Sequence, residues 1–271
     1  MADPVLYEVR ERVAILTLNR PRYRNAQSWE LLDALDAALD RSVADDQVRV
    51  VVLRGAGEHF SSGHDLGSPP QLEDERARGI PERGLAFYEN FRKYNLDYTL
   101  KWRNLAKPTI AMVHGYCIYG GWMIAAAMDL IFASEDAQFL AGLLEYFSVP
   151  WDLHPRVAKE LLFESRFLPA EEARQLGLAN RVLPRADLER ETLAFADRVA
   201  RNGRTTLRMS KLAVNKVQDI QGYSAALEAS FADFLVMTQT GRPRRRGEDP
   251  PRLGGVDLAL RGRRDEGSDG G

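Results

Sequence analysis

Cysteine is almost absent from this chain of 271 residues, since Cys117 is the only one. It lies in an apolar stretch, so neither a disulfide framework nor a cysteine-based zinc site is available. We therefore expect no metal and no bound prosthetic group. A reducing compartment, the cytoplasm, fits this composition.

An excess of either charge is also missing, because 37 Lys and Arg stand against 39 Asp and Glu, for a formal net charge of -2. No overall field favours nucleic acid as a partner. The first thirteen residues carry acidic and basic side chains where a signal peptide has an apolar run, and no window reaches the ~20 apolar residues of a membrane span. We expect a protein without a nucleic-acid or membrane partner.

Two phosphate-binding motifs are lacking as well. The sequence contains neither the G-x-G-x-x-G spacing of a dinucleotide-binding turn nor the G-x-x-x-x-G-K-[ST] of a nucleotide-binding loop. The absence disfavours a nicotinamide or ATP site of those kinds.

What the chain does contain is alternation of strand and helix patterns, which predicts an α/β fold with helices packed on sheets. Residues 5–18 predict two strands joined by a tight turn, and Ser28 is the predicted N-cap of a helix that extends to Val43. Further strands are predicted at 48–53, 109–113, 130–133 and 179–183, and helices at 82–104 and 120–128.

The C-terminal third changes character twice. Residues 205–218 and 223–238 predict two amphipathic helices, so we divide the chain into a core of residues 1–204 and a helical region of residues 205–240. Residues 241–271 are rich in Gly, Pro, Arg and acidic residues, which predicts a disordered tail. Its arginine cluster at 242–246 suits either a solvated charged run or contact with a phosphate-rich ligand.

Two glycine-containing loops that follow buried strands carry the main chemical signal. One is residues 60–66, FSSGHDL, and the other is residues 114–121, HGYCIYGG. Gly120 and Gly121 precede a helical segment, so their N–H groups lie at a helix N-terminus, where negative charge is favoured. Each loop taken alone is equally well explained as an ordinary strand-to-helix turn.

Over residues 5–240 the chain resembles the crotonase (enoyl-CoA hydratase/isomerase) family, on the two loops and on LNRP at 18–21, Asn25-Ala26, KPTIA at 107–111, Asp129, AEEA at 170–173 and Gly177-Leu178. The resemblance implies a spiral of strand-strand-helix repeats with a C-terminal helical trimerisation region. It also implies an acyl-CoA substrate, coenzyme A entering only as part of that substrate, and a homotrimer or a dimer of trimers.

The resemblance implies that the backbone N–H groups of His64 and Gly120 form an oxyanion hole for a thioester enolate. Two such donors contribute roughly 3 kcal/mol each to stabilising the transition state. Arg22 or Arg24 would reach a phosphate of the substrate, or else be exposed loop arginines. The expected substrate contacts are Arg24, Ala26, Ser62, Tyr116, Tyr119, Met123 and Leu143, although the two tyrosines suit core packing equally well.

Both glutamates that hydratases of this family use are replaced, because their positions read Met123 and Leu143. Neither side chain transfers a proton, so the usual two-glutamate hydration is not expected. The loop is about one residue longer than the family pattern, and a shift of its register would place Glu145 near the second position, which makes Glu145 our candidate general base. Asp152 and His154 form a second candidate pair, in which the carboxylate orients the imidazole.

Several functions remain open on these residues. The leading prediction is enolate chemistry on an acyl-CoA: isomerisation, decarboxylation, hydrolysis, C–C cleavage or an atypical hydration. A carrier-protein thioester or a β-diketone is an alternative substrate, and a catalytically inactive thioester-binding subunit is an alternative of another class. Aromatic residues, among them Tyr88, Phe91 and Tyr94, suit a bulky acyl group or, equally, helix packing.

Overall fold

The structure is a computed structural model that describes residues 3–79, 84–142 and 147–240. Its larger sheet has the strand order β1-β2-β3-β4-β6-β9. β1 pairs antiparallel with β2, and every later neighbour pair is parallel. The strands are β1 (Val5–Arg10), β2 (Val13–Leu18), β3 (Val50–Gly55), β4 (Thr109–Val113), β6 (Leu130–Ser134) and β9 (Arg181–Leu183).

A smaller sheet of order β5-β7-β8 lies beyond the carboxyl end of β4. Its strands are β5 (Tyr116–Ile118), β7 (Gln138–Leu140) and β8 (Leu168–Pro169). The helices that follow or cover the sheets in the first half of the chain are the 3₁₀ turn Pro21–Tyr23, α1 (Trp29–Ala44), α2 (Pro69–Arg78), α3 (Gly84–Arg92), the π-helix Lys93–Asp97, α4 (Tyr98–Arg103) and α5 (Gly120–Ala126).

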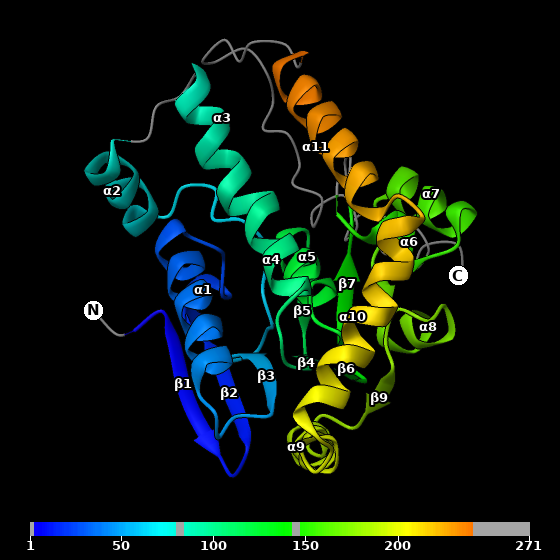
Figure 1. The fold of residues 1–271 in the computed structure, drawn as a ribbon. Coiled ribbons are helices and arrows are strands. Elements are labelled where there is room, and N and C mark those ends of the chain that lie inside the picture. The colour runs from blue at the N-terminus through cyan, green and yellow to red at the C-terminus, as the bar shows by residue number, and fades with distance from the viewer. Residues whose placement is uncertain (1–2, 80–83, 143–146, 241–271) are drawn as a thin grey trace, which may run out of the picture.

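The second half is mainly helical. Its helices are α6 (Val149–Asp152), α7 (Pro155–Glu164), α8 (Ala170–Gln175), α9 (Leu188–Ala200), α10 (Arg204–Ile220) and α11 (Tyr223–Thr240). Figure 1 shows α10 and α11 beside the sheets on the C-terminal side of the molecule. The crotonase-type α/β fold expected from the sequence is confirmed.

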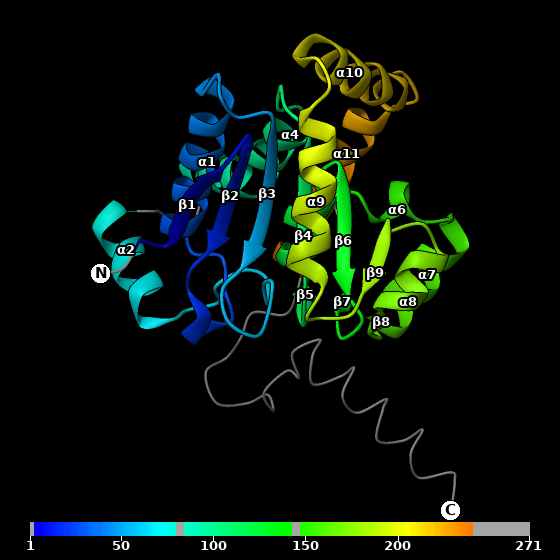
Figure 2. The ribbon, with the colours of Figure 1, turned by 90° about the horizontal axis from the view of Figure 1, so that it is seen from below.

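Strands β2, β3 and β4 are buried on both faces, as parallel strands inside a sheet require, whereas the edge strand β1 is mostly exposed. Val13, Ile15, Val50 and Val52 face α9, where they pack with Leu188 and its neighbours. The alternate strand residues face the main core under α1, α4 and α5, and Figure 2 shows α9 and α1 on opposite faces of the sheet. This sandwiching explains why the strands read as nearly continuous apolar runs.

Most predicted elements are confirmed, with local differences. The strand expected from residue 48 begins at Val50, because the N–H of Val48 still closes the turn at Asp46 and Gln47 by donating to the carbonyl of Asp45 at 3.1 Å. In place of the single regular helix expected over 82–104, the structure has α3, a π-helical turn and α4 in succession. The helical segment is confirmed, but the prediction of one uninterrupted α-helix was wrong. Ser28 caps α1 as expected, since its side chain accepts a hydrogen bond from the N–H of Leu31 at 3.2 Å.

Polar contacts fasten α10 to the core. Lys211 Nζ lies 3.0 Å from Asp129 Oδ2 and donates to the carbonyl of Lys107 at 3.2 Å. Asn215 Nδ2 donates to the carbonyl of Arg103 at 3.1 Å, and Arg103 in turn donates to the carbonyl of Asn215. The N-terminal half of the predicted helical region therefore continues the core instead of standing apart from it.

The outer side of α10 carries uncovered apolar side chains: Val214, Val217 and Ile220 are 55–77% exposed. In the part of the chain that the structure describes, no helix has the length and apolarity that a membrane span needs. The predicted disordered tail, residues 241–271, lies outside the described residues.

Candidate active site

The two glycine-containing loops lie against each other at the carboxyl ends of β3 and β4. The N–H of Ser61 donates to the carbonyl of Tyr116, and the N–H of Ile118 donates to the carbonyl of Ser61, both at 3.0 Å. A Cβ atom on Gly63 would lie 2.8 Å from the carbonyl oxygen of Ile118, and Gly63 has φ +89°. Only glycine permits this approach, which brings His64 beside Gly120.

Neighbouring hydrogen bonds leave two backbone donors facing the same place. The N–H of Gln27 donates to the carbonyl of Gly63 at 2.8 Å, and the N–H of Asp65 donates to the carbonyl of Gln27 at 3.0 Å. This pattern skips the N–H of His64, while Gly120 is the first residue of α5, where N–H groups have no intrahelical acceptor. Within the described residues neither N–H has a hydrogen-bond acceptor. The arrangement is that of an oxyanion hole.

Side chains of Gln27 and His64 crowd this point. A Cβ atom on Gly120 would lie 2.6 Å from Gln27 Oε1 and 2.9 Å from His64 Cε1. Gln27 is 4% exposed, and its Nε2 has no hydrogen-bond partner among the described residues. Burial lowers the pKa of His64 to about 4, so its imidazole is neutral at pH 7. Sequence reasoning missed Gln27, although it adjoins the Asn25-Ala26 pair.

The space in front of these donors is narrow and lacks a carboxylate in its described lining. It is too narrow for a sphere the size of a water molecule. Met123, at the first glutamate position, lies in the lining and is 4% exposed. The lining residues are Gln27, Leu32, His64, Tyr94, Asn95, Thr99, Trp102, Gly120, Met123 and Ile124. Only His64 and Tyr94 among them are titratable.

The π-helical turn supplies the far wall of this space. Tyr94 and Asn95 come from it, and Thr99 follows on α4. Asn95 donates to the carbonyl of Phe91, and Thr99 donates to the carbonyl of Leu96. A π-turn inserts one residue into the helical repeat and often marks a functional site. Asn95 and Thr99 could not be identified from the sequence, because a regular helix would present other residues to the site.

A buried ion pair holds the first loop in place. Arg20 Nη1 lies 2.8 Å from Asp65 Oδ2, with the two side chains 9% and 4% exposed. The same guanidinium donates to the carbonyl of Ala26 and to Ser68 Oγ. Burial raises the pKa of Asp65, but the hydrogen bonds from Ser68 and Arg20 outweigh it and leave that pKa lowered. The pair joins the loop at 20–28 to the residue after His64.

The predicted substrate contacts in the first loop and in residues 20–28 differ in their exposure to solvent. Ala26 is buried beneath the loop, and Ser62 is partly exposed and donates to the carbonyl of Tyr23 at 3.5 Å. Arg22 and Arg24 are exposed, so their guanidinium groups are free to reach a substrate phosphate.

The two predicted tyrosines belong to a different cluster. Tyr116 stacks on His59 and Phe167, with ring centroids 4.5 and 5.6 Å apart, and both tyrosines pack against Ile118, Leu140 and Phe167. Neither lines the space beside Gly120. Tyr119 has φ +47° and ψ -116°, a conformation that normally requires glycine. The turn before Gly120 therefore holds strained backbone.

The predicted pairing of Asp152 with His154 is wrong in this structure. Asp152 accepts a hydrogen bond from Ser148 Oγ at 2.5 Å, and burial raises its pKa to about 6. His154 is exposed and caps α7 through Nδ1, which accepts from the N–H of Arg156. Asp152 ends α6 and His154 precedes α7, so the chain turns between them. Asp152 lines a separate cavity of about 140 Å³ with Ala126, Met128 and Asp129.

Two predicted residues, Leu143 and Glu145, lie outside the described residues. In the part of the chain that the structure describes, no three His, Cys, Asp or Glu side chains are grouped to hold a metal ion. Burial raises the pKa of Cys117, which is fully buried beside the second loop.

Comparison with known proteins agrees with this geometry. Residues 8–242 match the model of the enoyl-CoA hydratase/isomerase family. A Mycobacterium tuberculosis protein named "Putative enoyl-CoA hydratase EchA13" is 40% identical over 240 residues, which is 81% of this chain and 75% of that protein.

Solved structures are similar as well. The crystal structure of a "probable enoyl-CoA hydratase" from Mycobacterium smegmatis has a TM-score of 0.77 and 42% identity, covering 86% of this chain and 92% of its own. A monofunctional enoyl-CoA isomerase from M. smegmatis has a TM-score of 0.65 and 29% identity, covering 80% and 95%. The relatives thus carry names of more than one reaction.

Proposed function

The chain belongs to the enoyl-CoA hydratase/isomerase family of acyl-CoA enzymes, and we propose that it stabilises a thioester enolate without the two-glutamate hydration mechanism. The products we propose are those of isomerisation, decarboxylation, hydrolysis or C–C cleavage. The observation that carries this proposal is the described lining of the space beside His64 and Gly120, which contains two free backbone donors and no carboxylate.

The donors act on the thioester oxygen. As the enolate forms, negative charge moves onto that oxygen, and two fixed N–H groups stabilise it by roughly 3 kcal/mol each. Gly120 also starts α5, whose N-terminus favours negative charge. Gln27 Nε2, buried and without a hydrogen-bond partner among the described residues, offers a third donor in the same space. These groups lower the barrier to any reaction that passes through an enolate.

The described lining residues include no strong base that could accept a proton from the substrate. Met123 has no ionisable group, and the pKa of about 4 makes His64 a weak base. We propose Glu145 as the single general base, on the sequence alignment alone. One carboxylate moves a proton between two carbons, which suffices for isomerisation, whereas hydration also requires activation of water.

A turnover screen with mass-spectrometric detection tests the proposal. Purified protein is incubated with enoyl-, β-ketoacyl- and aromatic acyl-CoAs, alongside Glu145→Gln and Gln27→Leu. We expect an isomerised, decarboxylated, hydrolysed or cleaved product, lost in Glu145→Gln and reduced in Gln27→Leu. Efficient hydration that survives Glu145→Gln would refute the proposal.

A second candidate is a catalytically inactive subunit that binds a thioester. The narrow space, which has no carboxylate among its described lining residues, favours it. Retention of both backbone donors is the observation against it, since a purely structural descendant does not need them. Tight acyl-CoA binding without turnover of any panel member would establish this candidate.

We further propose a homotrimer or dimer of trimers in a reducing, cytoplasmic compartment. The exposed apolar side chains on α10 support self-association, since oligomer interfaces are enriched in such residues. The buried lone thiol of Cys117 supports the compartment. Sedimentation velocity of the wild type and of Val217→Glu tests the assembly, which the charge should weaken.

A further inference from the structure

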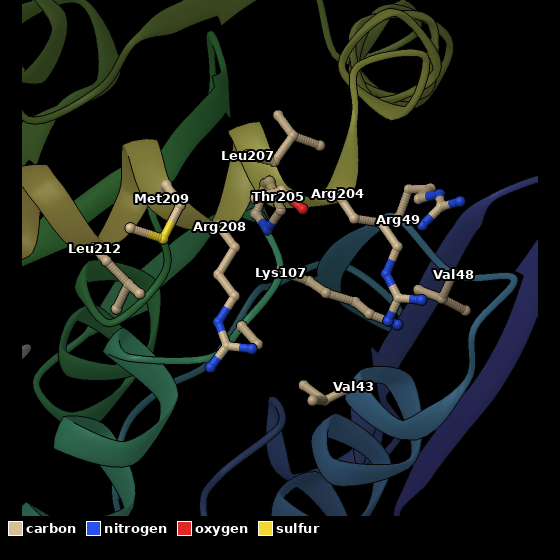
Figure 3. A pocket seen from close by; sticks show the side chains of 12 residues that line it. Val43, Val48, Arg49, Lys107, Arg204, Thr205, Leu207, Arg208, Met209 and Leu212 are labelled. Atoms are coloured by element: carbon tan, nitrogen blue, oxygen red, sulfur yellow. The ribbon is translucent and has the colours of Figure 1, made fainter.

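A second cavity, of about 570 Å³, lies at the opposite end of the large sheet from the oxyanion hole. Its wall includes Val48 and Arg49, just before β3, and Lys107 and Pro108, just before β4. His64 and Gly120 instead follow the carboxyl ends of these parallel strands. The first turns of α10 and the last turn of α1 complete the cavity (Figure 3). Its volume falls in the range of small-molecule sites.

Four cationic side chains line this cavity, and no carboxylate does among its described lining residues: Arg49, Lys107, Arg204 and Arg208. Lys107 is 6% exposed, and its Nζ donates to the carbonyls of Ser42 and Asp45, both neutral groups. Nearby acidic residues only partly balance this charge. Asp46 Oδ1 lies 2.5 Å from Arg204 Nη1, and the charges of Asp45 and Asp46 both attract the ammonium group of Lys107.

Two of the arginines have unused donors. Arg49 Nη1 is buried without a hydrogen-bond partner among the described residues. Arg208 is exposed, and within the described residues its guanidinium has neither a hydrogen bond nor an ion pair. An uncompensated buried guanidinium N–H is costly, and an anion would satisfy it.

The start of α10 adds backbone donors. Gly203 caps the helix without a side-chain hydrogen bond, and the first helical hydrogen bond runs from the N–H of Leu207 to the carbonyl of Gly203 at 3.1 Å. The preceding N–H groups are thus available to an anion, which the helix dipole also favours. Helix and cationic side chains act on the same cavity.

Apolar residues form the rest of the wall: Val43, Val48, Leu207, Met209 and Leu212. We propose that this cavity binds a small molecule with a diphosphate and a planar ring, of the nucleoside diphosphate class. The phosphates would lie among Arg49, Arg208 and the start of α10, and the ring against the apolar wall. A free nucleotide and the nucleotide part of coenzyme A share this chemistry.

Isothermal titration calorimetry with ADP tests the proposal on the full chain, with pyrophosphate, adenosine and coenzyme A as comparators. We expect ADP to bind more tightly than pyrophosphate, and adenosine not to bind. If coenzyme A binds here through its nucleotide part, ADP will compete with it; independent binding of the two would assign the site to free nucleotide. Arg208→Gln should weaken ADP binding roughly tenfold or more, because it removes a charge-assisted hydrogen bond.

Arg201→Gln is the matched control, because Arg201 is exposed, forms its ion pair within the described residues with Asp197 and lies outside the cavity. Arg208 makes no contact that folding needs, so its variant should keep the wild-type melting temperature. Equal ADP affinity of the two variants would overturn the proposal, since binding would then follow net charge alone. Absence of ADP binding would overturn it too, and a change of sedimentation in Arg208→Gln would then mark the cavity as an interface between copies.

Discussion

Replacing Gly120 by alanine should separate activity from stability. Its Cβ atom would lie 2.6 Å from Gln27 Oε1 and 3.0 Å from His64 Nε2, which are the ends of side chains that can move. The backbone need not shift, and alanine is the better helix former by up to about 1 kcal/mol. The fold should therefore tolerate the change.

The oxyanion hole should not tolerate it. The added methyl group occupies the point where the N–H of Gly120, the His64 imidazole and the Gln27 amide meet, so the thioester oxygen is displaced from its donors. Loss of one such donor costs roughly 2.7–4 kcal/mol, or about 100- to 1000-fold in kcat. The panel substrate with the highest turnover provides the rate, and thermal unfolding provides the stability.

Gly203→Ala is the control, because its Cβ atom would meet nothing closer than Thr206 Oγ1 at 3.7 Å. That variant should retain the rate, and its melting temperature should fall only slightly, because alanine is a poorer N-cap than glycine. A Gly120→Ala enzyme that keeps its full rate would refute the assignment of the oxyanion hole. A parallel fall of rate and melting temperature would show that Gly120 serves the fold instead.

Three further predictions follow from the geometry. Gly121→Ala should destabilise the protein by roughly 1–3 kcal/mol in urea unfolding, since its Cβ atom would lie 2.6 Å from the carbonyl oxygen of Ser61, which is backbone; an unchanged midpoint would contradict the loop contact. Arg20→Met should cost about 3–5 kcal/mol by leaving Asp65 unpaired, and adding Asp65→Leu should recover part of it; full stability of the single variant would argue against the buried pair. The pKa of Asp152 is about 6 in the folded state against 3.8 for an ordinary aspartate, so the folded state binds the proton more tightly and the free energy of unfolding falls as pH rises from about 4 to 6. Asp152→Asn should abolish this pH dependence and raise the free energy of unfolding by up to about 3 kcal/mol at pH 7. A pH dependence that persists in the variant would assign it to another group.

Elements with strong local signals were predictable from the sequence. The strand at 109–113 is confirmed to the residue, because a short run between Pro108 and His114-Gly115 is too short for a helix and fits a buried strand. Ser28 is confirmed as a cap, since its hydroxyl suits the free N–H groups of a helix start. The contact between the two glycine loops was implied by the family resemblance, and the structure gives its physical cause, since the parallel strands β3 and β4 end at one edge of the sheet.

Features that arise from a residue inserted into a helix, or from contacts between distant parts of the chain, could not be predicted from the sequence. The π-turn at 93–97 rotates Asn95 into the site, and its sequence is compatible with an ordinary helix. Gln27 is a polar residue in no motif, so only its place beside Gly120 reveals it. Asp152 and His154 are two positions apart, but the end of one helix and the start of the next send them to different surroundings.

The contacts that fasten α10 to the core also determine when the core can complete its folding during translation. They join residues 104 and 112 positions apart, Lys211 to Lys107 and Asn215 to Arg103. At translation speeds of about 5–20 residues per second, the core waits roughly 5–20 seconds for its last partner to be made. During that interval the core surface that α10 later covers is exposed on the nascent chain. A chaperone or an aggregating neighbour would therefore bind there first.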